Sequence, residues 1–145
     1  LMTFFTSGTP TIDSSLTFDV CQFFETKCYP SIANYDVEIY YCDLNEDGVK
    51  GWQEKNGDEF LIHIHDKLES IEEHIRTIFH ELVHCIQDIR GLSEENKREE
   101  QAYHLEEQFY KEYVTQNKVS TFFPFPSNIV YYNRVVNKQS IYEKT

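Results

Sequence analysis

The 145-residue sequence predicts a single α+β domain, in which a small antiparallel sheet packs against one long helix and a second helix follows. Two changes of pattern support this prediction. Residues 35–65 alternate apolar and polar side chains with a period of two, whereas residues 70–113 repeat apolar side chains every three to four positions. Hydrophobic residues make up 40% of the chain, which is sufficient for a core of its own.

The N-terminal region is expected to hold an arm followed by a helix. Residues 1–13 are polar around Gly8 and Pro10, which is typical of an arm or loop. A helix is predicted from Ser14 or Ser15 to about Tyr29. Its packed side would carry Leu16, Val20, Phe23 and Phe24.

Three strands are predicted between the first helix and the long one, at residues 35–41, 49–54 and 59–65. A turn at residues 45–48 joins the first two, and Asn56-Gly57 is a strong hairpin signal between the last two. Short turns between consecutive strands favour an antiparallel meander.

The long helix is predicted from Ser70 to Gly91. Ser70 and Glu73 form a capping box, in which both side chains accept backbone N–H groups at the helix start. Gly91 supplies the left-handed residue that ends a helix. One apolar stripe runs along it, through Ile71, Ile75, Ile78, Leu82, Ile86 and Ile89.

His80 and His84 lie on the opposite side of this helix from its apolar stripe. Two imidazoles four residues apart point the same way, roughly 6 Å apart at Cβ, so one tetrahedral Zn²⁺ can bridge them. Glu81 lies beside them, where it can act as general base toward a metal-bound water. The alternative is a chance five-residue match on a solvated helix face, with Glu81 an ordinary surface carboxylate.

A third ligand is expected from a second helix over residues 93–113, with Ser93 as its cap. Its apolar face carries Ala102, Leu105, Phe109 and Tyr113. Glu99 lies at the edge of that face and is the first choice as ligand, with Glu106 second and Glu95 third. Glu100 and His104 point away from the face, which disfavours both as ligands.

The sequence His80-Glu81-x-x-His84 followed by Glu99-x-x-Ala102 resembles the gluzincin metallopeptidases, most closely the compact ImmA/IrrE type, over about residues 49–110. Where that type carries Glu-x-Glu-Ala-Asn, this chain has Glu99-Glu100-Gln101-Ala102-Tyr103. SprT-like zincins are a second resemblance, but they take a His as third ligand, where the helical positions disfavour His104.

The resemblance implies a minimal zincin-like fold with Zn²⁺ on His80, His84 and Glu99, and hydrolysis of peptide bonds, by an endopeptidase rather than an exopeptidase. It also implies that residues 59–65 line the substrate groove and pair with an extended substrate. Tyr103, one turn after Glu99, is the candidate to stabilise the oxyanion.

The C-terminal part of the sequence adds less. Ser127 can cap a last helix, in which Tyr131, Tyr132 or Arg134 are further candidates to approach the site. Nothing in the sequence selects one of these three.

The formal charge of −12 disfavours nucleic acid and anionic membranes as partners and suits a basic peptide or protein substrate, although acidity also serves solubility. The chain opens with no charged-then-apolar signal peptide and contains no run of about eighteen apolar residues, so a cytoplasmic protein is expected. Its four cysteines, Cys21, Cys28, Cys42 and Cys85, form no CxxC pair, and Cys85 is expected to be a buried reduced thiol.

Three other hypotheses remain beside the peptidase. Residues 43–48 with Glu54 match the spacing of an EF-hand calcium loop, although strands are expected on both sides and a plain turn is favoured. His63 and His65 share one face of a strand as a metal pair or, preferably, as an exposed face. A non-catalytic zincin-like module that binds a partner or regulates it would use the same groove.

Overall fold

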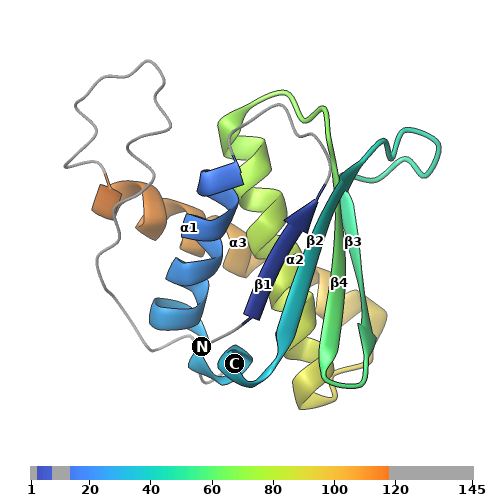
Figure 1. The fold of residues 1–145 in the computed structure, drawn as a ribbon. Helices are drawn as coiled ribbons and strands as arrows, with labels where there is room; N and C mark the ends of the chain where they lie inside the picture. The colour runs from blue at the N-terminus through green and yellow to red at the C-terminus, as the bar shows by residue number, and fades with distance from the viewer. Residues whose placement is uncertain (1–2, 8–13, 118–145) are drawn as a thin grey trace.

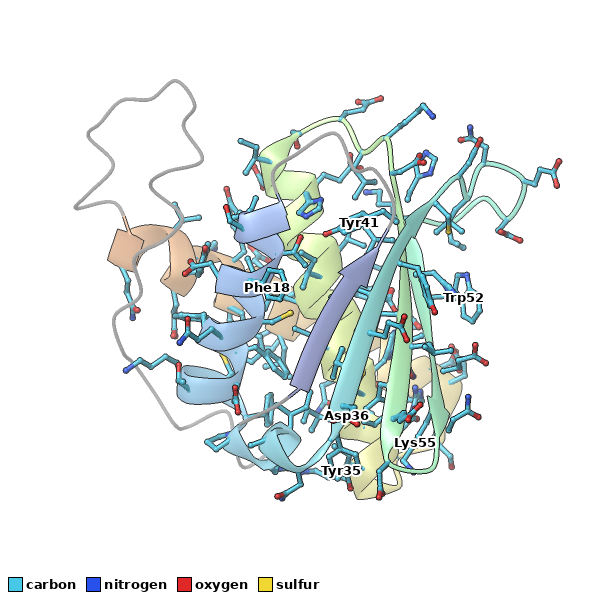
Figure 2. All side chains as sticks on the ribbon, viewed as in Figure 1. Phe18, Tyr35, Asp36, Tyr41, Trp52 and Lys55 are labelled. Carbon is cyan, nitrogen blue, oxygen red and sulfur yellow. The ribbon has the colours of Figure 1, made fainter. Side chains whose placement is uncertain are left out.

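A computed structural model describes residues 3–7 and 14–117 of the chain, and it has a mixed α+β fold. The sheet has four strands in the order β1-β2-β4-β3, and the helices cover one of its faces (Figure 1). The strands are β1 Thr3–Ser7, β2 Asp36–Cys42, β3 Gly51–Asn56 and β4 Glu59–His65. Their other face is left to the surface, where Trp52 points away from the helices (Figure 2).

The sheet is mixed, so the predicted antiparallel meander is wrong. Strand β4 pairs with β3 antiparallel through the Asn56-Gly57 turn, as expected, but it pairs with β2 in parallel, and β1 also runs parallel to β2. Residues 43–50 therefore do not close a hairpin between β2 and β3, because β4 lies between these two strands. The period of two identifies strands but does not select their partners.

The first part of the chain also differs from expectation. Within the predicted arm, Thr3–Ser7 form the edge strand β1, with Phe4 opposite Val37. Helix α1, Ser14–Phe23, then continues as a π-helical turn over Phe24–Cys28, which agrees with the predicted helix to about Tyr29. A short 3₁₀ turn over Pro30–Asn34 leads into β2.

Helix α2, Ile71–Arg90, begins and ends as its caps predict. The Ser70 side chain accepts the Glu73 N–H at 3.0 Å, and Gly91 adopts the left-handed conformation with φ 79°. Its burial exceeds the prediction: between His74 and Gln87 every residue except Arg76 is buried, including those on the histidine side. The histidine side is therefore a second packed face, covered by the sheet edge and by helix α3, Glu95–Asn117. Helix α3 begins two residues after Ser93, the predicted cap.

The main core lies between the sheet and the three helices, and it contains a cluster of aromatic rings where the helices meet. Phe79 of α2 contacts Phe23 and Phe24 from the first helical segment and Phe109 and Tyr113 from α3, with ring centroids 5.7–6.3 Å apart. Such clusters contribute buried area and edge-to-face contacts together. This packing fixes α2 relative to α3, and hence the relative position of any side chains between them.

Three further predictions concern the cysteines, the last predicted helix and membrane-spanning segments. All four cysteines are free, and Cys85 is buried, as expected. The predicted last helix and its candidates Tyr131, Tyr132 and Arg134 lie outside the described residues. Among the described helices, none combines the length and the apolar character that crossing a membrane requires.

Candidate functional site

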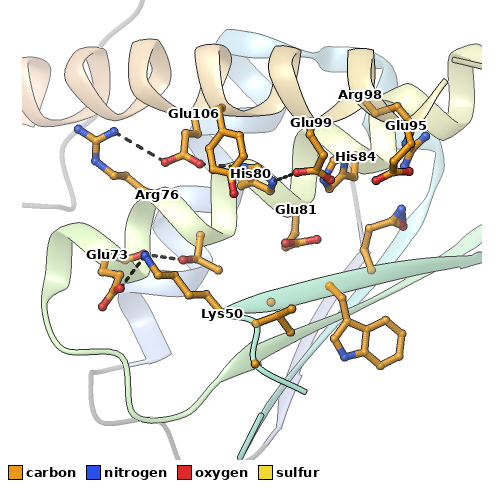
Figure 3. Close-up of a pocket in the computed structure, with 17 residues that line it drawn as sticks. Lys50, Glu73, Arg76, His80, Glu81, His84, Glu95, Arg98, Glu99 and Glu106 are labelled. Atoms are coloured by element: carbon orange, nitrogen blue, oxygen red, sulfur yellow. Dashed lines mark hydrogen bonds and ion pairs between the residues drawn. The ribbon is translucent and has the colours of Figure 1, made fainter. Parts of the chain in front are cut away.

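The predicted site residues line a cleft of about 690 Å³ bounded by α2, α3 and the start of β3 (Figure 3). This volume lies in the range of small-molecule and short-peptide sites. The chain contributes one continuous stretch from the sheet edge and residues on successive turns of each helix. The lining residues are Gly48–Gln53 from the edge; Glu73, Arg76, Thr77, His80, Glu81 and His84 from α2; and Glu95, Arg98, Glu99, Tyr103 and Glu106 from α3.

Two histidines and one carboxylate converge in this cleft. The Glu99 Oε1 atom lies 3.1 Å from His80 Nε2, and its Oε2 atom lies 3.1 Å from His84 Nε2. One ligand atom from each of these residues falls within 4.8 Å of the others, and no other group of three or more His, Cys, Asp or Glu in the described part of the chain does so. The ring of each histidine is nearly excluded from solvent.

The outer nitrogen of each histidine has a separate acceptor. His80 Nδ1 donates to Glu106 Oε1 at 2.8 Å, and His84 Nδ1 donates to Gln87 Oε1 at 2.7 Å. The orientation of the Gln87 amide is fixed, because its Nε2 donates to the Arg98 carbonyl and to Gln101 Oε1. A carboxylate and an amide oxygen can only accept, so both imidazoles carry a proton on Nδ1, and each ring in its neutral form directs the Nε2 lone pair inward.

This arrangement concentrates electron pairs without an internal donor. Two Nε2 lone pairs face the two oxygens of Glu99 at 3.1 Å, an approach that is repulsive unless a cation or protons lie between them. Tetrahedral ligands at roughly 2.0–2.1 Å from Zn²⁺ lie about 3.3 Å from one another. Each Nε2 atom of His80 and His84 lies 3.1 Å from a Glu99 oxygen, near this value, and an N₂O donor set is one that zinc takes.

Glu81 is placed differently from the three converging residues. It is 4% exposed, and its Oε1 atom has no hydrogen-bond partner. Burial, together with the charges of Glu99 and Glu106, raises its pKa to about 7, against the opposing effect of His80. A buried carboxylate with an unused oxygen beside a cleft is available to take or give a proton near neutral pH.

The two histidines differ in pKa because their outer partners differ. Burial lowers the pKa of both, but at His80 the Glu106 hydrogen bond and the surrounding carboxylates outweigh burial, so its pKa is raised. His84 has the neutral Gln87 as its outer partner, and burial keeps its pKa below the usual value.

The three alternative ligands occupy distinct positions. Glu99 faces both Nε2 atoms, whereas Glu106 reaches only the outer nitrogen of His80. Glu95 lies on the exposed wall of the cleft, and Glu100 and His104 are exposed, as their helical positions predict. The structure therefore brings together the predicted set of His80, His84 and Glu99, and gives Glu106 an outer position.

Tyr103 lines the cleft and its ring lies 4.6 Å from the ring of His80, but the residue is 62% exposed.

The expectation that residues 59–65 line the groove is wrong, because β4 is paired on both sides by β2 and β3. The edge next to the cleft is that of β3. The chain approaches α2 so closely there that a Cβ on Gly51 would lie 2.9 Å from the His63 carbonyl oxygen and 3.0 Å from Thr77 Cγ2.

The other predicted sites gain no ligand set. His63 and His65 share the outer face of β4, where His63 stacks on Trp52 at 4.0 Å and His65 Nδ1 accepts the Leu44 N–H. In the candidate calcium loop, Asp43 Oδ1 accepts the Asn45 N–H, and Glu54 lies within β3. Plain structural roles account for these side chains.

Two residues of the site were not predicted. Gln87 follows His84 by three positions, so its place on the same helix face was available from the sequence, but its role depends on contacts with α3. Gly51 is an isolated glycine in a strand, a signal of close backbone approach that does not name the neighbour.

Comparison with protein-family models, with curated proteins and with solved structures found no match to this chain.

Proposed function

We propose that this protein is a zinc-dependent metallopeptidase with a minimal zincin-like fold. The observation that carries the proposal is the inward convergence of His80 Nε2, His84 Nε2 and both Glu99 oxygens, beside a buried Glu81 oxygen that has no partner. His80, His84 and Glu99 would hold the ion. A Zn²⁺ ion held there would supply Lewis acidity toward water and toward a peptide carbonyl.

Glu81 is suited to move the proton in amide hydrolysis. It would accept a proton from the attacking water and deliver it to the leaving nitrogen, so that hydroxide adds to the carbonyl carbon and the C–N bond breaks. In the metal-free protein, burial raises the pKa of this carboxyl to about 7, so both of its protonation states are accessible near neutrality. Tyr103, beside His80 on the cleft wall, is the candidate to donate to the oxyanion.

The edge of β3 supports a peptide as the substrate. Among the described strands, β3 pairs with β4 alone, and residues Gly51–Gln53 line the cleft. A free strand edge offers backbone N–H and C=O groups to an extended chain. Gly51 keeps that edge close to α2, and so close to Glu81, whose Cγ would lie 3.3 Å from an added Cβ.

The test is hydrolysis of a mixed peptide library by the zinc-loaded protein, followed by mass spectrometry, with zinc content measured in parallel. Glu81→Gln should abolish cleavage and retain zinc, whereas Glu100→Gln, an exposed change on α3, should alter neither. Tyr103→Phe should lower kcat by roughly tenfold or more without loss of zinc if its hydroxyl meets the oxyanion. Bound zinc with no turnover of any peptide would contradict the peptidase and favour a binding module.

A further inference from the structure

The charged side chains along the cleft differ in whether they have an ion-pair partner within the protein. Each basic side chain that lines the cleft forms an ion pair with a carboxylate of the protein itself. The Lys50 Nζ atom lies 2.8 Å from Glu73, and the Arg76 Nε atom lies 2.8 Å from Glu72. The Arg98 Nη1 atom lies 2.7 Å from Asp88. Arg98 also donates to the Leu92 carbonyl at 2.8 Å. Among the described residues, the lining therefore offers no uncommitted cation to an acidic ligand.

Glu95 differs from the other acidic residues of the cleft. It is exposed on the first turn of α3 and has no ion pair within the described part of the chain. The basic residues nearest to it in sequence are engaged elsewhere, Lys97 with Glu94 and Arg98 with Asp88. Of the other carboxylates on this side, Glu99 faces both histidines and Glu81 is buried below the rim. Glu95 is thus the carboxylate available to a ligand at the His84 end.

The walls around that end are fixed in place. Asp88 Oδ1 accepts from Arg98 and its Oδ2 accepts from Gln53 Nε2 at 2.8 Å, so one carboxylate connects α2 to both α3 and β3. The rim is also apolar in part: of the four large hydrophobic side chains that the described residues expose, Val49 and Tyr103 line the cleft. A rigid rim with apolar surface and one free negative charge matches a long basic side chain, whose stem is apolar and whose end is charged.

We infer that the cleft selects peptides with an arginine or lysine side chain at the position that lies against Glu95. This inference rests on the proposed peptidase function, and names the substrate class for the same site. The formal charge of −12 on the whole chain acts in the same direction, since it attracts basic peptides at a distance. Recognition of the side chain itself should come from the short-range pair with Glu95.

The experiment uses Trp52, the single tryptophan of the chain, as a fluorescent reporter on β3, the strand that borders the cleft. The probes are acetylated octa-alanine peptides in which Arg, Gln or Glu replaces each position in turn. They are titrated into zinc-loaded Glu81→Gln protein, where the proposed mechanism allows no turnover. Arg should bind about fivefold more tightly than Gln at one or two positions, the upper range for one exposed ion pair.

Adding Glu95→Gln should remove that preference, and adding Glu95→Lys should invert it toward Glu peptides. Adding Glu100→Gln is the matched control, since it removes one charge from the exposed side of the same helix and should leave the preference intact. An arginine preference that survives Glu95→Gln, or binding without preference, or no binding would overturn the inference. Cleavage without charge preference would sink this inference alone, whereas charge-selective binding without cleavage by the wild-type protein would sink the peptidase alone.

Discussion

Helix α2 carries two kinds of buried histidine, and their surroundings separate a structural role from a chemical one. His74, on the first half of the helix, bonds through Nε2 to the Tyr41 hydroxyl at 3.0 Å, and Thr17 lies beside both. Within residues 14–117, no carboxylate pairs with His74, and burial lowers its pKa to about 3. The Tyr41 ring, which points from β2 toward the helices, stacks on His74 at 5.4 Å (Figure 2).

His80 and His84 are almost as buried as His74, yet each faces a carboxylate oxygen with Nε2 and a fixed acceptor with Nδ1. Burial alone therefore does not distinguish the proposed metal ligands from the core histidine on this helix. The distinction lies in what the inner nitrogen faces: a hydroxyl that can donate or accept for His74, and an acceptor-only carboxylate for the other two. The following variants test this comparison.

The largest contrast is expected between His84→Gln and His74→Gln. Loss of His84 should weaken zinc binding by at least about a hundredfold, because a few ligands divide a binding free energy on the order of 10–16 kcal/mol. His74→Gln should leave zinc affinity unchanged, since His74 contacts Tyr41 and Thr17 rather than the site. Competition with a chromophoric chelator measures both. Equal affinities in the two variants would remove the distinction.

A smaller effect is expected from the outer partners of the ligands. Glu106→Gln and Gln87→Leu each remove a group that orients an imidazole, and such changes typically reduce metal affinity by about 10- to 100-fold. Glu106→Gln keeps the size of the side chain and an oxygen that can accept from His80 Nδ1, so its effect should be the lesser of the two. Glu100→Gln serves again as control under the same chelator competition. Wild-type affinity in both variants would show that the outer contacts do not position the ligands.

The mildest effect concerns stability against pH in the metal-free protein. Burial lowers the pKa of His74 to about 3 in the folded protein, against 6.5 for an exposed histidine. Between these two pH values the unfolded chain therefore binds a proton on His74 that the folded protein does not bind. The His74 contribution to the free energy of unfolding is therefore present above pH 6.5 and is lost as pH falls, by up to about 1.4 kcal/mol per pH unit. The raised pKa of His80 acts in the opposite direction, since its contribution is present at low pH and lost as pH rises.

Urea unfolding between pH 4 and 7 measures the free energy of unfolding of the wild-type and His74→Gln proteins, and the difference between the two at each pH is the contribution of His74. The wild-type protein should lose stability on acidification more steeply than the variant. Parallel curves would mean that His74 is not buried as a neutral ring.

Local sequence patterns predicted what local physics determines. Ser70, Glu73 and Gly91 defined α2 because capping depends on residues within one turn of the helix end. The relative positions on the helical wheel also placed Glu99 toward α2 and Glu100 away from it, since the angle between two residues of one helix is fixed.

The sheet and the outer contacts of the site could not be predicted in the same way. The alternation in β2 and β4 is the same whether they pair in parallel or antiparallel, and Thr3–Ser7 is too short and polar to stand out from a loop. Glu106 and Gln87 acquire their roles only when the aromatic core sets the distance between α2 and α3. Such contacts depend on tertiary structure, and a single sequence leaves them open.

The most direct test of the metal site is a crystal structure of the purified protein, with anomalous diffraction recorded on both sides of the zinc absorption edge. One anomalous peak is expected, from a zinc ion bonded to His80 Nε2, His84 Nε2 and a Glu99 oxygen at roughly 2.0–2.2 Å. No peak from crystals grown with added zinc, or a zinc ion held by other residues while His80 and His84 keep only Glu99 for a partner, would contradict it.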